Sequence, residues 1–237
     1  MNKYVEQCIG QVIVSCQAPK EVPFHGAEYM KLMAASVIQG GAKAIRACWP
    51  DDIKAIRELG DFPIVGINKI FDDSKPRYEQ IFITPTFESA AAIIEAGCDI
   101  VALDCQIREF RGKDELYNLI KKIKEVYPDV PLMADCATLE EMVFAAETGM
   151  IDIVSSTLSG SVKKMDGPDL EILVEAKKRV KVPINAEGRI NDVNDLIAVL
   201  ETGVEMVTIG RAITMPQYSA HRFINCYEEF KKKQKTS

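Results

Sequence analysis

The chain is 237 residues long, with 47% hydrophobic and 27% charged residues and a formal net charge of −6 at pH 7. This length permits a single domain with a sizeable core, and the composition excludes a disordered or collagen-like chain. Nucleic acid is not expected as a partner, because nucleic-acid binding relies on a broad basic surface and acidic residues outnumber basic ones here, 35 to 29.

Eight apolar segments rich in β-branched residues are predicted as strands, and a segment with helical periodicity follows each of them. The predicted strands lie near residues 11–16, 42–47, 63–68, 99–104, 131–135, 150–155, 182–187 and 204–209. The predicted helices lie near residues 26–39, 50–59, 87–96, 113–127, 138–148, 168–179, 191–202 and 217–232.

One pattern recurs at four of the junctions between a helix and the next strand. Beginning at Gln39, Glu95, Glu147 and Glu201, the helical run closes on Gly and an apolar run follows at once. Glycine tolerates the left-handed conformation that ends a helix, and short helix-to-strand loops are typical of βα repeats. The third connection is longer, and I-F-I-T-P at 81–85 is a candidate for an extra short strand.

The eight units average about 30 residues, which is the size that a (β/α)₈ barrel requires. No linker or low-complexity stretch divides the chain. We therefore predict an α/β protein in which residues 1–237 form one single-domain TIM barrel. A doubly wound open sheet is the structural alternative.

The sequence also predicts a cytoplasmic protein that does not enter a membrane. Its N-terminus lacks a basic segment followed by an apolar run and a small-residue cleavage site. No stretch approaches the roughly 20 apolar residues that span a bilayer. The seven cysteines are scattered without a C-x-x-C pair, and the chain has only two histidines, so we expect reduced thiols that serve mainly in packing and no metal site.

Polar or charged residues occur at the predicted C-terminal ends of six strands. In chain order they are Gln17, Arg46, Lys69, Asp104, Asp135 and Glu187. In a barrel the strand ends and βα loops converge on one face, where TIM-barrel enzymes have their active sites. Simpler explanations exist, because an Asp at a strand end also caps helices or anchors loops, and a Lys also reaches past a strand to solvent. The sequence leaves both readings open for Asp104 and Asp135.

Residues two apart share a face of a strand. Lys69 is in phase with Ile67, and Arg46 is in phase with Ala44, a small residue that leaves room for the long side chain. Both are expected to point into the barrel mouth. Strands three and seven are opposite each other in an eight-stranded barrel, so Lys69 and Glu187 are expected to approach a ligand from opposite sides.

The last two strands are each followed by a Gly-Arg pair, Gly188–Arg189 and Gly210–Arg211. TIM barrels often bind phosphate at this position through backbone N–H groups and a helix N-terminus, and arginine adds a charge-assisted fork. The pattern predicts an anion site, with turn geometry plus surface charge as the alternative. A histidine triad, a dinucleotide fingerprint and a P-loop are not indicated.

Taken together and in order, several strings resemble the bacterial N-acetylmannosamine-6-phosphate 2-epimerase family. They are I-V-S-C-Q-A, G-G-A-K-A-I-R-A, V-G-I-N-K, I-T-P-T, V-A-L-D, M-A-D-C-A-T-L-E-E, S-S-T-L-S-G, A-E-G-R-I and G-R-A-I-T. They extend from near residue 11 to beyond residue 216, which is most of the chain. The family commonly has G-G-A-I-T-R-P where this chain has G-R-A-I-T-M-P, so the resemblance supports Gly210 more strongly than Arg211.

The resemblance implies a TIM-barrel isomerase that interconverts N-acetylmannosamine 6-phosphate and N-acetylglucosamine 6-phosphate in sialic acid catabolism, without a cofactor. It implies Lys69 as the catalytic acid/base and Glu187 as its companion. It implies as substrate-binding residues Gln17, Arg46, Asp135, Gly188, Arg189, Gly210 and Arg211. Two alternatives remain at this point: another phosphate-binding barrel enzyme, such as a Schiff-base aldolase using Lys69, and a sugar-phosphate sensor without activity. A homo-oligomer is left open.

Overall fold

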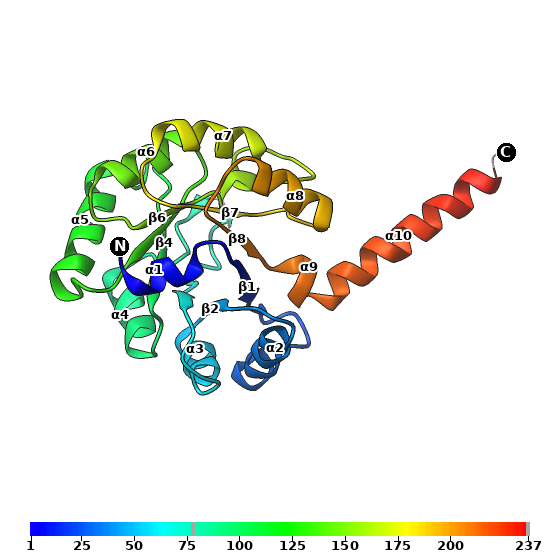
Figure 1. Cartoon of the computed structure of the whole chain (residues 1–237), viewed down its shortest axis with the longest axis horizontal. Helices are drawn as coiled ribbons and strands as arrows, with labels where there is room; N and C mark the ends of the chain where they lie inside the picture. Colours follow the sequence, from blue (N-terminus) through cyan, green and yellow to red (C-terminus); the bar gives the residue numbers. More distant parts are fainter. Residues whose placement is uncertain (77–78, 236–237) are drawn as a thin grey trace.

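The computed structural model describes residues 1–76 and 79–235. Its eight strands form a closed barrel in which they follow one another in sequence order (Figure 1). The strands are β1 (Val12–Cys16), β2 (Ala44–Cys48), β3 (Ile64–Ile67), β4 (Ile100–Asp104), β5 (Leu132–Asp135), β6 (Ile153–Ser155), β7 (Ile184–Glu187) and β8 (Met206–Ile209). All neighbours are parallel, and β8 closes the ring by pairing with β1. The predicted (β/α)₈ barrel is confirmed, and the open sheet is excluded.

Helices follow the strands and surround the barrel (Figure 1). They are α2 (Ala27–Gln39), α3 (Pro50–Arg57), α4 (Phe87–Glu95), α5 (Lys113–Val126), α6 (Leu139–Glu147), α7 (Leu170–Arg179) and α8 (Val193–Glu201), with a short 3-10 helix η2 (Ser159–Ser161) after β6. Thr86 and Thr138 begin α4 and α6 with capping boxes that satisfy otherwise unpaired N–H groups. All seven α-helices overlap the predicted ranges.

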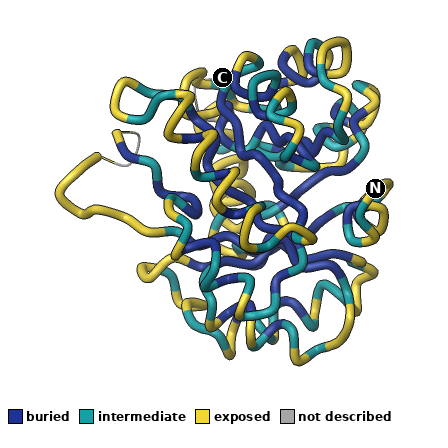
Figure 2. Tube along the Cα trace, turned by 90° about the vertical axis from the view of Figure 1, so that its left-hand side faces the viewer, coloured by how far each residue is buried: buried dark blue, intermediate teal, exposed yellow. Residues whose placement is uncertain are grey.

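Alternation along the strands divides the core into two layers. Inward-facing Ile13, Val65 and Ile100 belong to a cluster inside the barrel. The outward-facing neighbours Val14 and Val101 pack instead beneath the helices. The strands are almost entirely buried, and Figure 2 shows buried segments through the middle of the molecule with many exposed segments around them. Burial on both faces of each strand explains why the strand sequences are mostly apolar, with polar residues concentrated toward their C-terminal ends.

A helix that the sequence analysis did not predict closes one end of the barrel. Helix α1 (Lys3–Cys8) precedes β1, and its Val5 and Cys8 join the cluster inside the barrel. They are 1% and 0% exposed. The end at which the strands begin is therefore plugged by apolar side chains, and the opposite end remains available for a site.

One expectation about the loops needs correction, and the last helix, although it forms as predicted, has a position that the sequence analysis did not address. The segment 81–85 is not a strand, because only Ile83 makes an isolated bridge, to Lys69, and the backbone turns at Thr84 with φ +48°. The final helix forms as α10 (Pro216–Lys235) after a short α9 (Arg211–Thr214), but it projects away from the barrel (Figure 1). Residues 220–230 of α10 are all exposed. Within the described residues, no helix is long and apolar enough to cross a membrane.

Gly66 lies in β3, the strand that precedes Lys69, where the backbone packs against Cys98. A Cβ added to Gly66 would lie 2.6 Å from the Cβ of Cys98 and 2.9 Å from its Sγ. We expect Gly66→Ala to lower the free energy of unfolding by about 1–3 kcal/mol, the usual cost of overpacking a core, measured by urea denaturation. Gly167→Ala is the control, since its added Cβ would meet nothing closer than 3.8 Å. Equal stability of the two variants would contradict this packing.

Candidate active site

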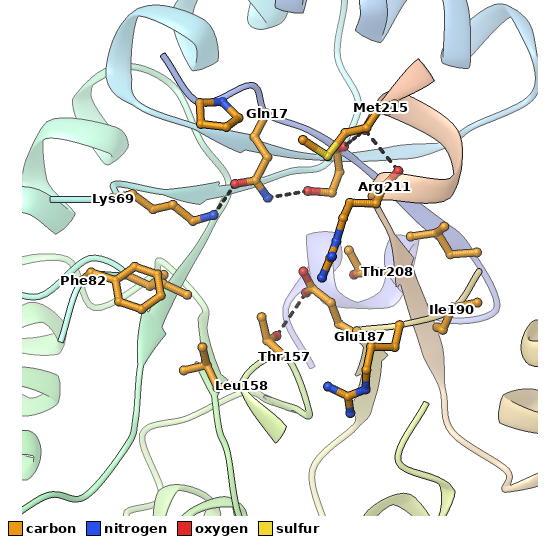
Figure 3. Close-up of a pocket in the computed structure, with 18 of the residues that line it drawn as sticks. Gln17, Lys69, Phe82, Thr157, Leu158, Glu187, Ile190, Thr208, Arg211 and Met215 are labelled. Carbon is orange, nitrogen blue, oxygen red and sulfur yellow. Dashed lines mark hydrogen bonds between the residues drawn. The ribbon is translucent and has the colours of Figure 1, made fainter. Parts of the chain in front are cut away.

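A pocket of about 420 Å³ lies at the C-terminal ends of the strands (Figure 3). Seven of the nine predicted site residues line it: Gln17, Lys69, Glu187, Gly188, Arg189, Gly210 and Arg211. Apolar side chains, among them Trp49, Phe71 and Phe82, complete its wall beside Lys69. The pocket therefore combines charged groups with apolar surface, as ligand sites commonly do.

Lys69 is held at the pocket wall by both its side chain and its backbone. Its Nζ donates a hydrogen bond to Oε1 of Gln17 at 2.5 Å, and Gln17 Nε2 donates to Ser15 Oγ at 2.8 Å (Figure 3). The Lys69 carbonyl accepts a hydrogen bond from the indole N–H of Trp49 at 3.0 Å. As alternation predicted, Ile67 is part of the cluster inside the barrel. The lysine thus approaches the pocket with its amine oriented.

Arg46 and Asp135, the other two predicted site residues, lie beneath the pocket and do not line it. Arg46 is 1% exposed and Asp135 is 0% exposed. The guanidinium donates through Nη1 and Nη2 to the two Asp135 oxygens at 3.1 and 2.5 Å, and Nη1 lies 3.1 Å from Oε2 of Glu187. One cation therefore faces two carboxyl groups in a water-poor interior. Such an arrangement favours a proton on one of the carboxyls.

Glu187 is a carboxyl with a raised pKa. Burial raises its pKa above the usual range, opposed chiefly by the charge of Arg46, and the negative charge of Asp135 raises the pKa further. Glu187 also lines the pocket. The site therefore places a protonatable acid and an amine, Lys69, around one cavity, which is an arrangement suited to proton transfer.

Hydroxyl and amide side chains that the sequence analysis did not single out surround Glu187. Thr157 Oγ1 is 2.7 Å from Asp135 Oδ1 and 3.1 Å from Glu187 Oε2. Ser155 and Asn185 lie just below, joined by a hydrogen bond of 2.7 Å. Two-residue alternation could have found them, because Ser155 precedes Thr157 and Asn185 precedes Glu187 by two positions. Their residue types are too common at strand ends to attract notice singly.

The two Gly-Arg pairs lie together at the ends of β7 and β8. Gly188 and Arg189 both have positive φ, 111° and 58°, and the Arg189 guanidinium donates to Gly167 O at 2.7 Å and to Ser159 Oγ at 2.9 Å. Arg211 lies over the Tyr218 ring at 5.5 Å. Burial lowers the pKa of Arg189, the negative charge of Asp169 opposes this, and the charge of Arg211 lowers the pKa further. The left-handed turn and the two adjacent cations make this corner attractive to an anion.

Asp104 is a loop anchor in this structure. It is fully buried and outside the pocket lining, and it accepts hydrogen bonds from Gln106 N at 3.0 Å and Arg111 Nη2 at 3.4 Å. Burial raises its pKa to about 6, opposed by Arg111. Neither Asp104 nor Asp135 caps a helix, because Gly112 and Thr138 occupy those positions. Within residues 1–76 and 79–235, no group of three or more His, Cys, Asp or Glu side chains is arranged to hold a metal ion.

Comparison with known proteins identifies relatives over most of the chain. A sequence model of the family described as "Putative N-acetylmannosamine-6-phosphate epimerase" matches residues 30–229. A protein of Caldanaerobacter subterraneus subsp. tengcongensis named "Putative N-acetylmannosamine-6-phosphate 2-epimerase" is 40% identical over 223 residues, 92% of this chain and 91% of its own length. A Clostridioides difficile protein of the same name is 38% identical and covers 92% of this chain and 96% of its own length.

Solved structures agree with the sequence comparisons. The N-acetylmannosamine-6-phosphate 2-epimerase from Clostridium perfringens matches with a TM-score of 0.84 and 36% identity over 94% of this chain and 95% of that one. A structure described as "a putative deoxyribose-phosphate aldolase" from Coccidioides immitis matches with a TM-score of 0.64 at 13% identity, over 93% of this chain and 87% of that one. The second likeness shows a shared fold alone.

The buried guanidinium gives a stability prediction. Arg46→Met leaves Asp135 and Glu187 without a cation, and removing one partner of a buried ion pair costs about 3–5 kcal/mol. We expect that loss in the free energy of unfolding at pH 8. The loss becomes smaller at pH 5.5, because without Arg46 the folded-state pKa of Glu187 rises further above its unfolded value, and stability is lost as the pH rises through it.

Urea denaturation at the two pH values measures this effect. Lys31→Met is the control, because its partner Glu58 is exposed and surface pairs contribute at most about 1 kcal/mol. A loss for Arg46→Met that is the same at both pH values would show that the carboxyls do not depend on Arg46 for their charge.

Proposed function

This chain belongs to the N-acetylmannosamine-6-phosphate epimerase family, and we propose that it interconverts N-acetylmannosamine 6-phosphate and N-acetylglucosamine 6-phosphate in sialic acid and amino sugar catabolism. The observation that carries the proposal is the shared pocket of an oriented amine, Lys69, and a carboxyl with a raised pKa, Glu187. The family likeness favours epimerisation over the aldolase and sensor alternatives. The protein is proposed to act on a sugar phosphate, without a cofactor, in the cytoplasm.

The reaction requires removal of a proton from C2 of the open-chain sugar, where the neighbouring C1 aldehyde makes that proton acidic. We propose that Lys69 takes this proton as a neutral amine and that Glu187 returns one to the other face of the enolate. In the reverse direction the two residues exchange roles. Gln17 orients the lysine amine. Arg46 and Asp135, which the sequence analysis named as substrate-binding residues, lie beneath the pocket, and we propose that they serve the substrate by holding Glu187 in place.

The phosphate group is proposed to bind at the two Gly-Arg turns. Gly188 and Gly210 allow the backbone to approach the anion, and Arg189 and Arg211 supply its counter-charges. The positive charges of the two arginines repel each other, and an anion bound between them would offset this repulsion. Anchoring the far end of the sugar lets remote binding energy position C2 between Lys69 and Glu187.

Proton NMR in D₂O tests the reaction directly. With N-acetylmannosamine 6-phosphate we expect product that carries deuterium at C2, because the departing proton exchanges with solvent or is replaced from the other face. Lys69→Ala is expected to fold and to lose turnover, while Lys54→Ala on the exposed side of α3 retains it. Turnover without C2 exchange, or near-normal activity of Lys69→Ala, would refute the assignment. Borohydride trapping of substrate on Lys69 would favour a Schiff-base aldolase.

The anion site predicts strong preference for the phosphorylated sugar. Unphosphorylated N-acetylmannosamine leaves the Gly-Arg donors unpaired, and we expect kcat/KM to fall on the order of a hundredfold or more. Arg189→Ala is expected to remove most of this preference. Arg179→Ala, which removes an exposed arginine of α7, is the control and should keep it. Equal kcat/KM for the two sugars with the unmodified protein would refute a phosphate pocket here.

We propose that the protein is a homo-oligomer in which α10 packs on a second copy. Phe223 and Tyr227 of α10 are 80% and 63% exposed, on a helix that projects from the barrel. Helices α8 and α2, which precede β8 and follow β1 in the barrel, also expose large apolar residues, including Ile197, Leu200 and Leu32. Apolar surface on both partners is what a subunit contact would bury.

Light scattering coupled to size-exclusion chromatography measures the oligomer. We expect at least twice the mass of one chain, and a shift toward one chain for Phe223→Glu, because a charge at a buried contact is strongly unfavourable. Asn225→Glu adds the same charge on the opposite side of α10 and is the control. A monomeric unmodified protein would contradict the proposal.

A further inference from the structure

A row of polar side chains crosses the barrel interior at the floor of the pocket, from β8 to β5, and its members Thr208 and Thr157 line the pocket. Thr208 Oγ1 donates to Asn185 Oδ1 at 2.9 Å, and Asn185 Nδ2 donates to Ser155 Oγ at 2.7 Å. Ser155 Oγ lies 2.7 Å from Thr157 Oγ1, which lies 2.7 Å from Asp135 Oδ1. Thr208, Asn185 and Ser155 are at most 2% exposed, so these groups depend on one another for hydrogen bonds.

The row has a direction, because an amide nitrogen only donates and an amide oxygen only accepts. Thr208 donates to the Asn185 oxygen, which turns the Asn185 nitrogen toward Ser155. Ser155 accepts that hydrogen bond and keeps its own proton for Thr157. The proton of Thr157 then goes to its nearest acceptor, the Asp135 carboxylate that Arg46 holds in place.

This direction leaves Thr157 with no proton for Glu187. A hydroxyl has one proton and two lone pairs: the proton goes to Asp135, and one lone pair accepts from Ser155. The remaining lone pair faces Oε2 of Glu187 at 3.1 Å. Two oxygen atoms without a proton between them repel each other at this distance, whereas a protonated carboxyl would make a hydrogen bond there.

We propose that this directed row of hydrogen bonds holds Glu187 as the protonated acid in the substrate-free protein, with Thr157 as the positioning residue that accepts its hydrogen bond. The inference rests on the proposed function only for the use to which the acid is put. It assigns the protonation state of the pocket before N-acetylmannosamine 6-phosphate binds: Glu187 carries a proton and faces the amine of Lys69.

The surrounding charges support this state. The charged groups that face Glu187 are Arg46 from β2, Asp135 from β5 and Lys69 beyond β3. The strands on either side, β6 and β8, contain no charged residue. With Glu187 neutral, Arg46 and Asp135 balance each other in the buried floor. Burial is the largest influence on the pKa of Glu187 and raises it; Arg46, Lys69 and any hydrogen bond donated by Thr157 oppose this, and the pKa remains raised.

The proton balance of the reaction follows. The C2–H bond breaks and its proton moves to the Lys69 amine, which becomes an ammonium, while the electron pair is left on the enolate. The O–H bond of Glu187 then breaks, and its proton forms the new C–H bond on the other face. The protein is left with a carboxylate at Glu187, and exchange of one proton each with solvent returns both residues to their starting states.

Infrared difference spectroscopy of the substrate-free protein tests the inference without turnover. We expect a carboxylic-acid C=O band that Glu187→Gln abolishes and that disappears as the pH rises. In Thr157→Val, which keeps the shape and removes the acceptor, the midpoint of this loss should fall by about one pH unit or more, a tenfold loss of proton affinity. Thr157→Ser, which restores the hydroxyl, should return the midpoint to that of the unmodified protein.

The direction of the shift decides the outcome. If Thr157 instead donates to a Glu187 carboxylate, Thr157→Val raises the midpoint, and this result, or an unchanged midpoint, overturns the proposal. Thr208→Val is a second variant, one that acts only through the direction of the row, and it should lower the midpoint by less. Absence of turnover with an intact band would count against the proposed function and leave this inference standing. Turnover without the band would overturn this inference and leave the proposed function standing.

The pH profile gives a matching kinetic readout. Because the acid form of Glu187 is required, kcat/KM should decline as the pH rises through its pKa. Thr157→Val should move that decline to lower pH by the same amount as the infrared midpoint. A purely structural role for Thr157 would lower the rate at every pH and leave the profile in place.

Discussion

The buried guanidinium of Arg46 is the constraint around which the upper half of the barrel is organised. It bonds Asp135 on β5 and approaches Glu187 on β7 from β2, so one side chain joins three strands across the interior. A charge so buried is tolerated only when carboxyl groups are held close to it. That requirement determines where both carboxyls lie and, because one cation serves two acids, how readily Glu187 holds a proton.

The two ends of the barrel have different roles: one end is filled by apolar residues that stabilise the fold, and the other carries the polar residues of the site. Apolar residues such as Ile13 and Ile100 fill the end at which the strands begin, and α1 seals it with Val5 and Cys8. The other end carries hydroxyl, amide and charged groups whose hydrogen bonds are satisfied mainly within the barrel. Each group there is positioned by others before substrate arrives, which is the preorganisation that electrostatic catalysis requires.

The two-residue alternation along the strands predicted which way several site residues point. It correctly predicted that Lys69 continues the inward face of Ile67 and that Arg46 points inward beyond Ala44. It did not indicate that Arg46 and Asp135 form a floor below the pocket, because depth along the barrel axis depends on how the strands are staggered in the closed sheet. The sequence analysis also did not predict α1 or the projection of α10 away from the barrel, because both depend on what each helix packs against.

The sequence by itself determined the order of the βα units, the faces of the strands and the residue types at their ends. These are local properties, set by periodicity, glycine positions and side-chain chemistry within a few neighbouring residues. Only the tertiary structure decided that Thr157, which follows β6, lies between Asp135 and Glu187, and that hydrogen bonds join Thr208, Asn185, Ser155 and Thr157 in one row. Hydrogen bonds between groups 22 to 30 residues apart follow from the pairing and register of neighbouring strands, which bring side chains at their ends within hydrogen-bonding distance.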